Sequence, residues 1–500
     1  MMIKRFTVLV LACTLSLSLL VGCTPSDTEG TGSDNNVAVT SATPKYIFML
    51  IGDGMSAVQV NAAQVLTGDN VSGEVAVNQL NFTEFPVLGM ATTQDSTSFC
   101  PDSASTATAM SCGVKTHSGV IGLEVNKQTV ATNICELLKD EGMKIGVISS
   151  VTINHATPAA YYAHIASRND YYDIAMQMAD SGFDYFGGGT INKPTGDDKD
   201  KQDAYEILEE KGYTVADTNE EIAALNSSSG PCYAVTPVTQ DSGSMNYAID
   251  AAADELSLAG FLQKGIEVLD NENGFFIICE SGKIDWACHA NDATATIGDI
   301  LAFEDVVDVA LEFAKAHPEE TLIIVTGDHE TGGMTIGYAS TGYSTAFDVL
   351  NNQKMSFTAF DGLITEQKKA NANLTFDQMM PLISENFGLI LSNNTAATED
   401  NVMVLSDLEE QKLRNAFAET MKPAEERTEN DETYLLYGGY EPLSVTITHI
   451  LNNKAGIGWT SYSHTGVPVP VYAYGAAADV FSGSYDNTDV FKKICEVCEL

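Results

Sequence analysis

The chain has 500 residues, of which 44% are hydrophobic, so it can bury a large core in one domain with insertions or in two domains. Its 68 acidic residues outnumber 25 basic ones and give a formal net charge of −43. This charge excludes nucleic acids and anionic lipid surfaces as favourable partners. Any phosphate-handling site in such a chain needs metal ions or a buried arginine to reverse the local charge.

The first residues form a predicted targeting segment. Lys4 and Arg5 precede an apolar run that ends in Leu-Val-Gly-Cys23, and a basic start with a short apolar stretch is typical of a secretory signal. The ending resembles the lipobox of bacterial lipoproteins, in which the cysteine is lipidated. An ordinary signal peptide with an incidental cysteine is the alternative. We expect residues 1–22 to be a lipoprotein signal peptide and Cys23 to anchor an exported protein, periplasmic or on the cell surface, to a membrane.

Residues 23–43 are rich in Ser, Thr, Gly, Asp and Asn and are predicted to form a flexible tether. Short continuous apolar runs then alternate with helical patterns. The runs typical of strands buried on both faces lie at 46–51, 144–149, 274–279 and 321–326. This alternation predicts an α/β fold, in which a mostly parallel central sheet carries helices on both faces.

The main domain is predicted to span residues 44–490, with 491–500 as a C-terminal tail. Within it, residues 337–456 are polar and lack the rhythm of buried strands, which indicates a large insertion. The segment Val467–Tyr474 that follows is apolar but contains prolines, so we expect an edge strand there.

Residues 101–116 are unusually rich in Ala, Ser and Thr. Within it, Pro101 and Asp102 before the first helical turn and Gly113 after the last one are start and stop signals of a helix. They place Ser103 at a helix N-terminus, where free N–H groups and the helix dipole favour negative charge. The alternative is a helix packed against the sheet, with Asp102 and Ser103 acting only as caps.

Oxygen ligands gather at one edge of the predicted sheet. In parallel sheets, ligands bind beyond the carboxyl ends of the strands, and Asp53, Thr157, Glu280 and Asp328 all follow strands there. Together, Asp53, Thr157 and Glu280 make an all-oxygen group that suits magnesium.

Histidines add two further candidate metal groups. Asp285 and His289 are four residues apart and share one face if their segment is helical, and His464 could supply a third ligand. The pair Asp328-His329 could be completed by Asp53. Carboxylate oxygen with histidine nitrogen is a ligand set that zinc prefers.

These motifs, in this order, closely resemble the alkaline phosphatase family, from about residue 44 to 490. The matching positions are Asp53, Asp102-Ser103-Ala104, Thr157-Pro158, Arg168, Glu280, Asp285, His289, Asp328-His329 and His464-Thr465-Gly466. The resemblance implies two zinc ions and one magnesium ion. One zinc is then held by Asp285, His289 and His464, the other by Asp53, Asp328 and His329, and magnesium by Asp53, Thr157 and Glu280.

The resemblance also implies the reaction, which is hydrolysis of small phosphate monoesters through a phosphoserine intermediate with release of inorganic phosphate. Ser103 is then the nucleophile, while Arg168 and Asp102 belong to the substrate-binding group. A bound metal lowers the pKa of the serine hydroxyl, and Arg168 offers a planar, bidentate donor to two phosphate oxygens. A homodimer is a further implication.

Two positions depart from the family pattern. His155 stands where some relatives have Asp, and Trp286 where some have a basic residue. Both positions usually lie around magnesium and phosphate, so we count both residues as substrate-binding. The missing cation suggests weaker phosphate binding with faster release.

Two other functions stay open at this point. One is a phosphodiesterase of the same superfamily, although such enzymes often use Thr as the nucleophile and lack the arginine clamp. The other is a surface lipoprotein that binds metal or phosphate without turnover, although a binding protein has no need of a serine between two metals.

Overall fold

The structure is a computed structural model that describes residues 42–68, 75–398 and 400–500. The predicted signal peptide, Cys23 and nearly all of the predicted tether lie outside these ranges.

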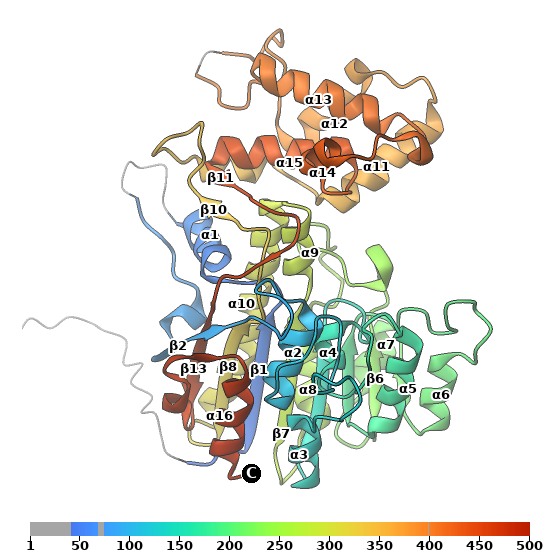
Figure 1. The fold of residues 1–500 in the computed structure, drawn as a ribbon, viewed down its shortest axis with the longest axis vertical. Helices are drawn as coiled ribbons and strands as arrows, with labels where there is room; N and C mark the ends of the chain where they lie inside the picture. The colour runs from blue at the N-terminus through green and yellow to red at the C-terminus, as the bar shows by residue number, and fades with distance from the viewer. Residues whose placement is uncertain (1–41, 69–74, 399) are drawn as a thin grey trace, which may run out of the picture. The chain divides into compact units, whose positions relative to one another are not determined.

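A ten-stranded sheet forms the centre of the fold, in the order β14-β2-β13-β8-β1-β7-β3-β4-β6-β5 (Figure 1). The strands are β1 (Tyr46–Gly52), β2 (Val87–Thr92), β3 (Lys144–Ser149), β4 (Tyr185–Gly188), β5 (Thr214–Ala216), β6 (Cys232–Val235), β7 (Phe275–Ser281), β8 (Thr321–Gly327), β13 (Val469–Gly475) and β14 (Gly483–Asp486). Only β13 runs antiparallel to its neighbours, so the predicted mostly parallel sheet is confirmed.

Apolar side chains cover both faces of this sheet. Along β1, Phe48 and Leu50 join one cluster with helices α1, α8 and α10, whereas Met49 and Ile51 join another with α2–α6 and α16. Successive side chains of a strand point to opposite faces, so a strand that is apolar throughout must be covered on both sides. The layered α/β architecture follows.

The helices that flank the sheet are α1 (Ala57–Thr67), α2 (Ser103–Cys112), α3 (Ile134–Asp140), α4 (Ala156–Ala159), α5 (Tyr171–Ser181), α6 (Ala204–Glu210), α7 (Asn219–Ala224), α8 (Leu258–Leu269), α9 (Lys283–His289), α10 (Ala293–Ala316) and α16 (Thr488–Cys498). The boundary predicted at residue 490 falls inside α16, whose apolar side packs on the sheet domain. Within the described ranges, no helix combines the length and hydrophobicity needed to cross a bilayer.

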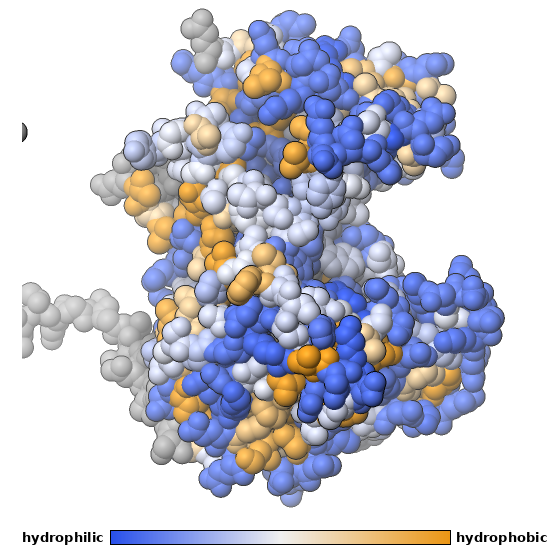
Figure 2. All heavy atoms as spheres, in the orientation of Figure 1, coloured by the Kyte–Doolittle hydropathy of each residue, from blue (hydrophilic) through white to orange (hydrophobic). Residues whose placement is uncertain are grey.

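The segment 337–456 is helical and is closed by a short pair of strands. The strand β10 (Thr335–Ile336) precedes it and pairs antiparallel with β11 (Ile457–Gly458), which follows it. Its helices are α11 (Phe357–Ala370), α12 (Phe376–Phe387), α13 (Asp407–Thr420), α14 (Asp431–Tyr437) and α15 (Pro442–Ala455). In Figure 2, hydrophilic residues dominate the visible surface over α11–α13 and over α5–α7, in keeping with the acidic composition.

One sequence-based expectation about strands was wrong, and three strands were not predicted. The segment Val467–Tyr474 is not an edge strand, because β13 lies between β2 and β8. Proline is tolerated there because Pro470 precedes the residues that pair with β8, which begin at Val471. The polar stretch 180–245 also contributes three short strands, β4, β5 and β6, that continue the parallel sheet.

Candidate active site

Three adjacent parallel strands end level with one another at the site. Gly52, the last residue of β1, is paired with Ser281 at the end of β7 and with Gly327 at the end of β8. The chain continues from these strands into Asp53, helix α9 and Asp328, respectively. The register of the sheet therefore brings together three of the segments that carry predicted ligands.

Helix α2 presents Ser103 to this edge. The Asp102 side chain caps the helix by accepting the Ser105 N–H at 3.1 Å, and Gly113 ends it with φ of 70°. A left-handed residue at this position is a common helix stop, and glycine adopts it at little cost. The Ser103 side chain is buried, and its Oγ lies 3.1 Å from His329 Nε2. The serine thus lies at the helix N-terminus, as predicted.

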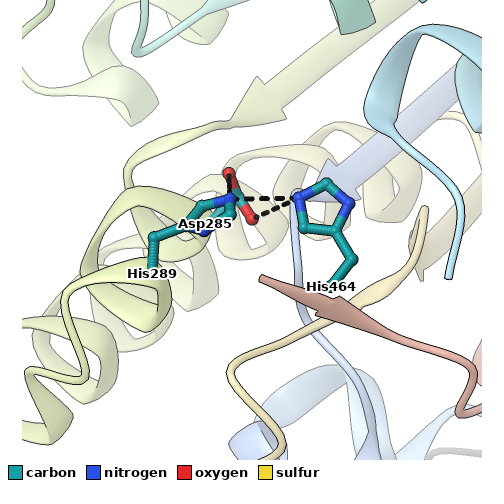
Figure 3. Close-up of side chains that lie close together, drawn as sticks. All are labelled: Asp285, His289 and His464. Carbon is teal, nitrogen blue, oxygen red and sulfur yellow. Dashed lines mark hydrogen bonds and ion pairs between the residues drawn. The ribbon is translucent and has the colours of Figure 1, made fainter. Parts of the chain in front are cut away.

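Asp285, His289 and His464 converge on one point (Figure 3). His289 Nε2 lies 3.0 Å from His464 Nε2 and 3.4 Å from Asp285 Oδ2. The Nδ1 of His289 lies 2.6 Å from the Tyr462 carbonyl, and that of His464 lies 2.5 Å from the Pro101 carbonyl. A ring nitrogen that bonds a carbonyl fixes the tautomer and leaves the other nitrogen free for a metal. The donor set therefore fits zinc.

A second group surrounds His329, which follows β8. His329 Nε2 lies 3.3 Å from Asp53 Oδ1 and 3.3 Å from Asp328 Oδ2, and all three side chains are fully buried. Asp328 is held in place by the Gly54 N–H at 3.1 Å and by the Thr106 hydroxyl at 3.0 Å. The predicted second set of ligands is therefore gathered in one place.

The third group consists of buried oxygen atoms that accept no hydrogen bond from any described residue. Both carboxylate oxygens of Asp53, the Thr157 hydroxyl and Glu280 Oε1 are buried and have no hydrogen-bond partner among the described residues. Buried polar atoms without partners are costly unless an ion or water satisfies them. The donor chemistry suits magnesium. His155 also lies here, because its ring and the carboxylates of Asp53 and Glu280 offer ligand atoms within 4.8 Å of one another.

Burial, followed by the crowding of like charges, controls the pKa values of the carboxylates at the site. Burial, and then the carboxylates of Asp328 and Asp285, raise the pKa of Asp53 well above its ordinary value. Burial raises the pKa of Glu280 to about 7 and that of Asp328 to about 6. Ionised carboxylates gathered in a buried space require cations, so the site is built to hold positive charge.

Arg168 lies beside the serine helix. Its Nη1 donates to Asp102 Oδ2 at 3.0 Å, and its Nη2 lies 3.2 Å from His155 Nε2. Burial, and then the charge of Arg168, lower the pKa of His155 to about 3, so the neutral imidazole accepts this hydrogen bond. Trp286 lies on α9 between two metal-group residues, and its ring centroid is 5.8 Å from that of His155. All four predicted substrate-binding residues thus lie at the same site.

Two residues that support the site, Thr331 and Lys283, were not predicted from the sequence. The Thr331 hydroxyl donates to Asp285 Oδ1 at 2.6 Å and lies 3.2 Å from His329 Nδ1, so it orients residues of both histidine groups. Its place shortly after Asp328 and His329 was the available signal. Lys283, at the start of α9, is fully buried and pairs with Asp241 at 2.5 Å. No local pattern links these two positions.

Comparisons with known proteins show which family the chain belongs to. The sequence model of the alkaline phosphatase family matches residues 44–500. The chain belongs to the alkaline phosphatase family. Alkaline phosphatase 3 of Bacillus subtilis (strain 168) is 30% identical over 463 residues, which cover 90% of this chain and 88% of that protein.

Solved structures of alkaline phosphatases share the fold. The cold-active enzyme of a psychrophilic Shewanella sp. is 26% identical, with a TM-score of 0.73, over 91% of this chain and 99% of that one. The enzyme of the Antarctic bacterium TAB5 is 25% identical, with a TM-score of 0.62, over 92% and 99%. Two TAB5 variants, in which a histidine is replaced by Glu or Asp, hold Mg in a site named M3. This chain is therefore an enzyme of the alkaline phosphatase family with residue clusters suited to metals.

Proposed function

We propose that this enzyme hydrolyses phosphate monoesters through a phosphoserine at Ser103 and releases inorganic phosphate. The observation that carries the proposal is the position of Ser103 Oγ. It lies at the N-terminus of α2, 3.1 Å from His329 and beside the ligand groups described above. A serine in this position can attack a substrate, whereas a protein that only binds metal does not need a nucleophile there.

The chain's own residues account for most of the reaction. Ser103 Oγ attacks phosphorus, the bond between phosphorus and the alcohol oxygen breaks, and the alcohol leaves on the opposite side. Water then cleaves the phosphoserine bond, which restores the hydroxyl and frees phosphate. Arg168 donates N–H groups to the phosphate oxygens, and Asp102 orients the guanidinium.

Two zinc ions and one magnesium ion are the proposed cofactors. Asp285, His289 and His464 would hold one zinc, and the group around His329 the other. The all-oxygen group of Asp53, Thr157 and Glu280 would hold magnesium. When bound, these ions supply the positive charge that lowers the pKa of the serine hydroxyl and stabilises the attacking and leaving oxygens.

The test combines one variant with metal removal and restoration. We expect the zinc- and magnesium-loaded enzyme to release phosphate from a chromogenic monoester at alkaline pH. Chelator should abolish the release, and Ser103→Ala should lower kcat by at least about 1,000-fold, since the nucleophile is lost. Acid quenching should trap phosphate on the wild type and not on Ser103→Ala.

A matched control variant is Ser111→Ala, on the same helix, whose hydroxyl bonds the Ala160 carbonyl away from the ligand groups. It should retain activity. A metal-loaded wild type that releases no phosphate from monoesters, or a Ser103→Ala variant as active as Ser111→Ala, would contradict the proposal. Activity on diesters alone would favour the phosphodiesterase alternative.

We also propose that the protein is exported and anchored through lipidated Cys23. The basic and apolar start of the chain and its Leu-Val-Gly-Cys ending support this proposal. Labelling with a fatty-acid analogue should mark the wild type and not Cys23→Ser. Equal labelling of both would contradict it.

A further inference from the structure

A cavity of about 400 Å³ opens beside the first metal group. Its wall includes His289, Trp286, Tyr247, Asp241, Phe357 and Tyr440. We propose that this cavity is the leaving-group subsite of the enzyme and that it selects phosphate monoesters whose alcohol carries a neutral aromatic ring. The inference rests on the proposed monoester hydrolysis and names the class of substrate for that reaction.

The position of the cavity follows from the direction of the reaction. Ser103 Oγ lies against His329, so phosphorus is attacked from the side of that group. In an in-line displacement the leaving oxygen departs on the side away from Ser103. We place it at the neighbouring group of Asp285, His289 and His464, in which the His464 ring centroid lies 3.6 Å from that of His329. His289 belongs both to this group and to the wall of the cavity. The departing alcohol therefore faces the cavity.

Aromatic rings from two parts of the chain build the wall. Tyr247 and Trp286 come from the sheet domain, whereas Phe357 and Tyr440 come from the helical segment 337–456. The ring centroids of Tyr247 and Phe357 lie 5.8 Å apart, and those of Phe357 and Tyr440 lie 5.7 Å apart, both in edge-to-face geometry. Tyr247 is fully buried and Phe357 nearly so, so these two rings support the wall from behind. An aromatic ring in the cavity gains contact area and edge or face contacts from the more exposed Trp286 and Tyr440.

The wall is held rigidly in place. Phe357 is the first residue of α11, and its N–H donates to Asp292 Oδ2 at 3.0 Å. The preceding residue, Ser356, donates its N–H to Asp250 Oδ1 at 2.9 Å. These bonds tie the start of the helical segment to the sheet domain. The subsite is thus formed before substrate arrives, which lowers the entropic cost of binding.

The ammonium group of Lys283 indicates that the leaving group bound in the cavity is neutral. The Lys283 ammonium lies 3.6 Å from the centroid of the Tyr247 ring and 5.0 Å from that of Trp286, so it occupies the place where these rings would attract a cation. The same ammonium pairs with Asp241, the carboxylate of the wall. A quaternary ammonium group in the cavity would therefore meet a neutralised acid and a like charge.

The test compares substrates that differ only in the ring. The esters 2-phenylethyl phosphate and 2-cyclohexylethyl phosphate have leaving alcohols of similar acidity and size. We expect kcat/KM of the metal-loaded enzyme to be about 10-fold higher for the phenyl ester, the size of effect expected for aromatic contacts. Tyr440→Leu should remove this preference and lower kcat/KM for the phenyl ester more than that for ethyl phosphate, because ethanol does not reach the rings.

Tyr343→Leu is the matched control, because Tyr343 lies in the same segment but is fully exposed. It should keep the preference. Matched phosphonates, which cannot be hydrolysed, provide a readout of binding alone through the fluorescence of the two tryptophans, of which Trp286 lines the cavity and Trp459 does not. The phenylethyl phosphonate should bind more tightly than the cyclohexylethyl one, and Tyr440→Leu should abolish the difference.

Three outcomes would overturn the subsite while leaving the proposed function intact. They are equal rates for the phenyl and cyclohexyl esters, an equal loss for ethyl and phenylethyl phosphate in Tyr440→Leu, and a preference for choline phosphate over its neutral isostere, 3,3-dimethylbutyl phosphate. Absence of phosphate release from every ester would instead overturn the proposed function, and this inference with it.

Discussion

Side chains around the proposed phosphate site supply little positive charge of their own. Arg168 is oriented by Asp102, whereas Lys283 pairs with Asp241 and lies 5.0 Å from the centroid of the Trp286 ring. Because the Trp286 ring lies beside His155, which contacts Arg168, a cationic side chain at position 286 would lie near the proposed phosphate site.

Trp286→Lys should strengthen inhibition by inorganic phosphate. A charge-assisted hydrogen bond adds about 1.5–3 kcal/mol, so the inhibition constant should fall by about 10-fold or more. Leu435→Lys is the control, since it adds the same charge at an exposed apolar position of α14. Equal inhibition constants for wild type and Trp286→Lys would refute the idea that Trp286 weakens phosphate binding.

Among individual residues, the sequence predicted those that offer ligand atoms to a metal, but not the residues that hold these ligands in place. Asp53, Asp328 and His329 directly follow buried strands, so their position at the sheet edge could be inferred. The pair of Lys283 with Asp241 could not, because it depends on how the loop after β6 folds back onto α9. The same holds for the aromatic wall, where Phe357 and Tyr440 are brought together by the packing of the helical segment.

Packing between helices explains where the serine helix ends. Gly113, the residue after α2, has φ of 70°, and a Cβ built there would lie 2.5 Å from the Phe491 ring of α16. The C-terminal helix thus closes tightly over the end of α2.

Gly113→Ala should therefore destabilise the fold, because the side chain meets both an unfavourable φ and a clash. We expect a loss of about 2–4 kcal/mol in the free energy of unfolding, measured by denaturant titration. In Gly119→Ala the φ of 80° is similar but nothing lies within 4 Å of the added Cβ, so about 1 kcal/mol should be lost. Equal losses would show that the contact with α16 contributes nothing.

A partly buried acid, Asp361, lies where α11 contacts α15. The Ser444 hydroxyl of α15 donates to Asp361 Oδ1 of α11, and burial raises the pKa of Asp361 to about 7. The folded state then binds a proton that the unfolded state releases at about pH 4. Stability from this group is therefore present at low pH and is lost as pH rises from about 4 to about 7.

Asp361→Asn should remove this loss while keeping an oxygen that accepts from Ser444. At about pH 8 the variant should be more stable than wild type by at least about 1 kcal/mol, and the difference should shrink as the pH falls towards about 4. Glu366→Gln, exposed on the same helix, should show no such dependence. A gain that does not vary with pH would contradict this assignment.

Elements with strong local patterns were the ones that the sequence predicted. The long apolar strands β1, β7 and β8 and the serine helix lie where expected. The strands β4, β5 and β6 have only three or four residues each, too few for a hydrophobic pattern to stand out from a loop. The interior position of β13 depends on β2 and β14, which close the sheet beyond it.

Acidic side chains across the whole molecule repel one another. With 68 acidic and 25 basic residues, compacting the chain brings like charges together, and salt screens them over a distance of about 10 Å at 0.1 M. Raising NaCl from about 20 mM to about 500 mM should therefore increase Tm at neutral pH. The increase should shrink near about pH 4, where carboxylates become neutral. A Tm that does not change with salt at neutral pH would contradict this expectation.

The metal groups draw their ligands from nearly the full length of the chain. Asp53 follows the first strand, whereas His464 begins β12 (His464–Thr465), which pairs with β9 (Glu330–Thr331). Because synthesis runs from the N-terminus, a nascent chain holds its acidic ligands long before the last histidine exists. An ion captured at that stage would meet an incomplete set of donors. If the proposed ions bind, correct metallation follows translation, and a C-terminally truncated chain would lack a ligand of the finished centre.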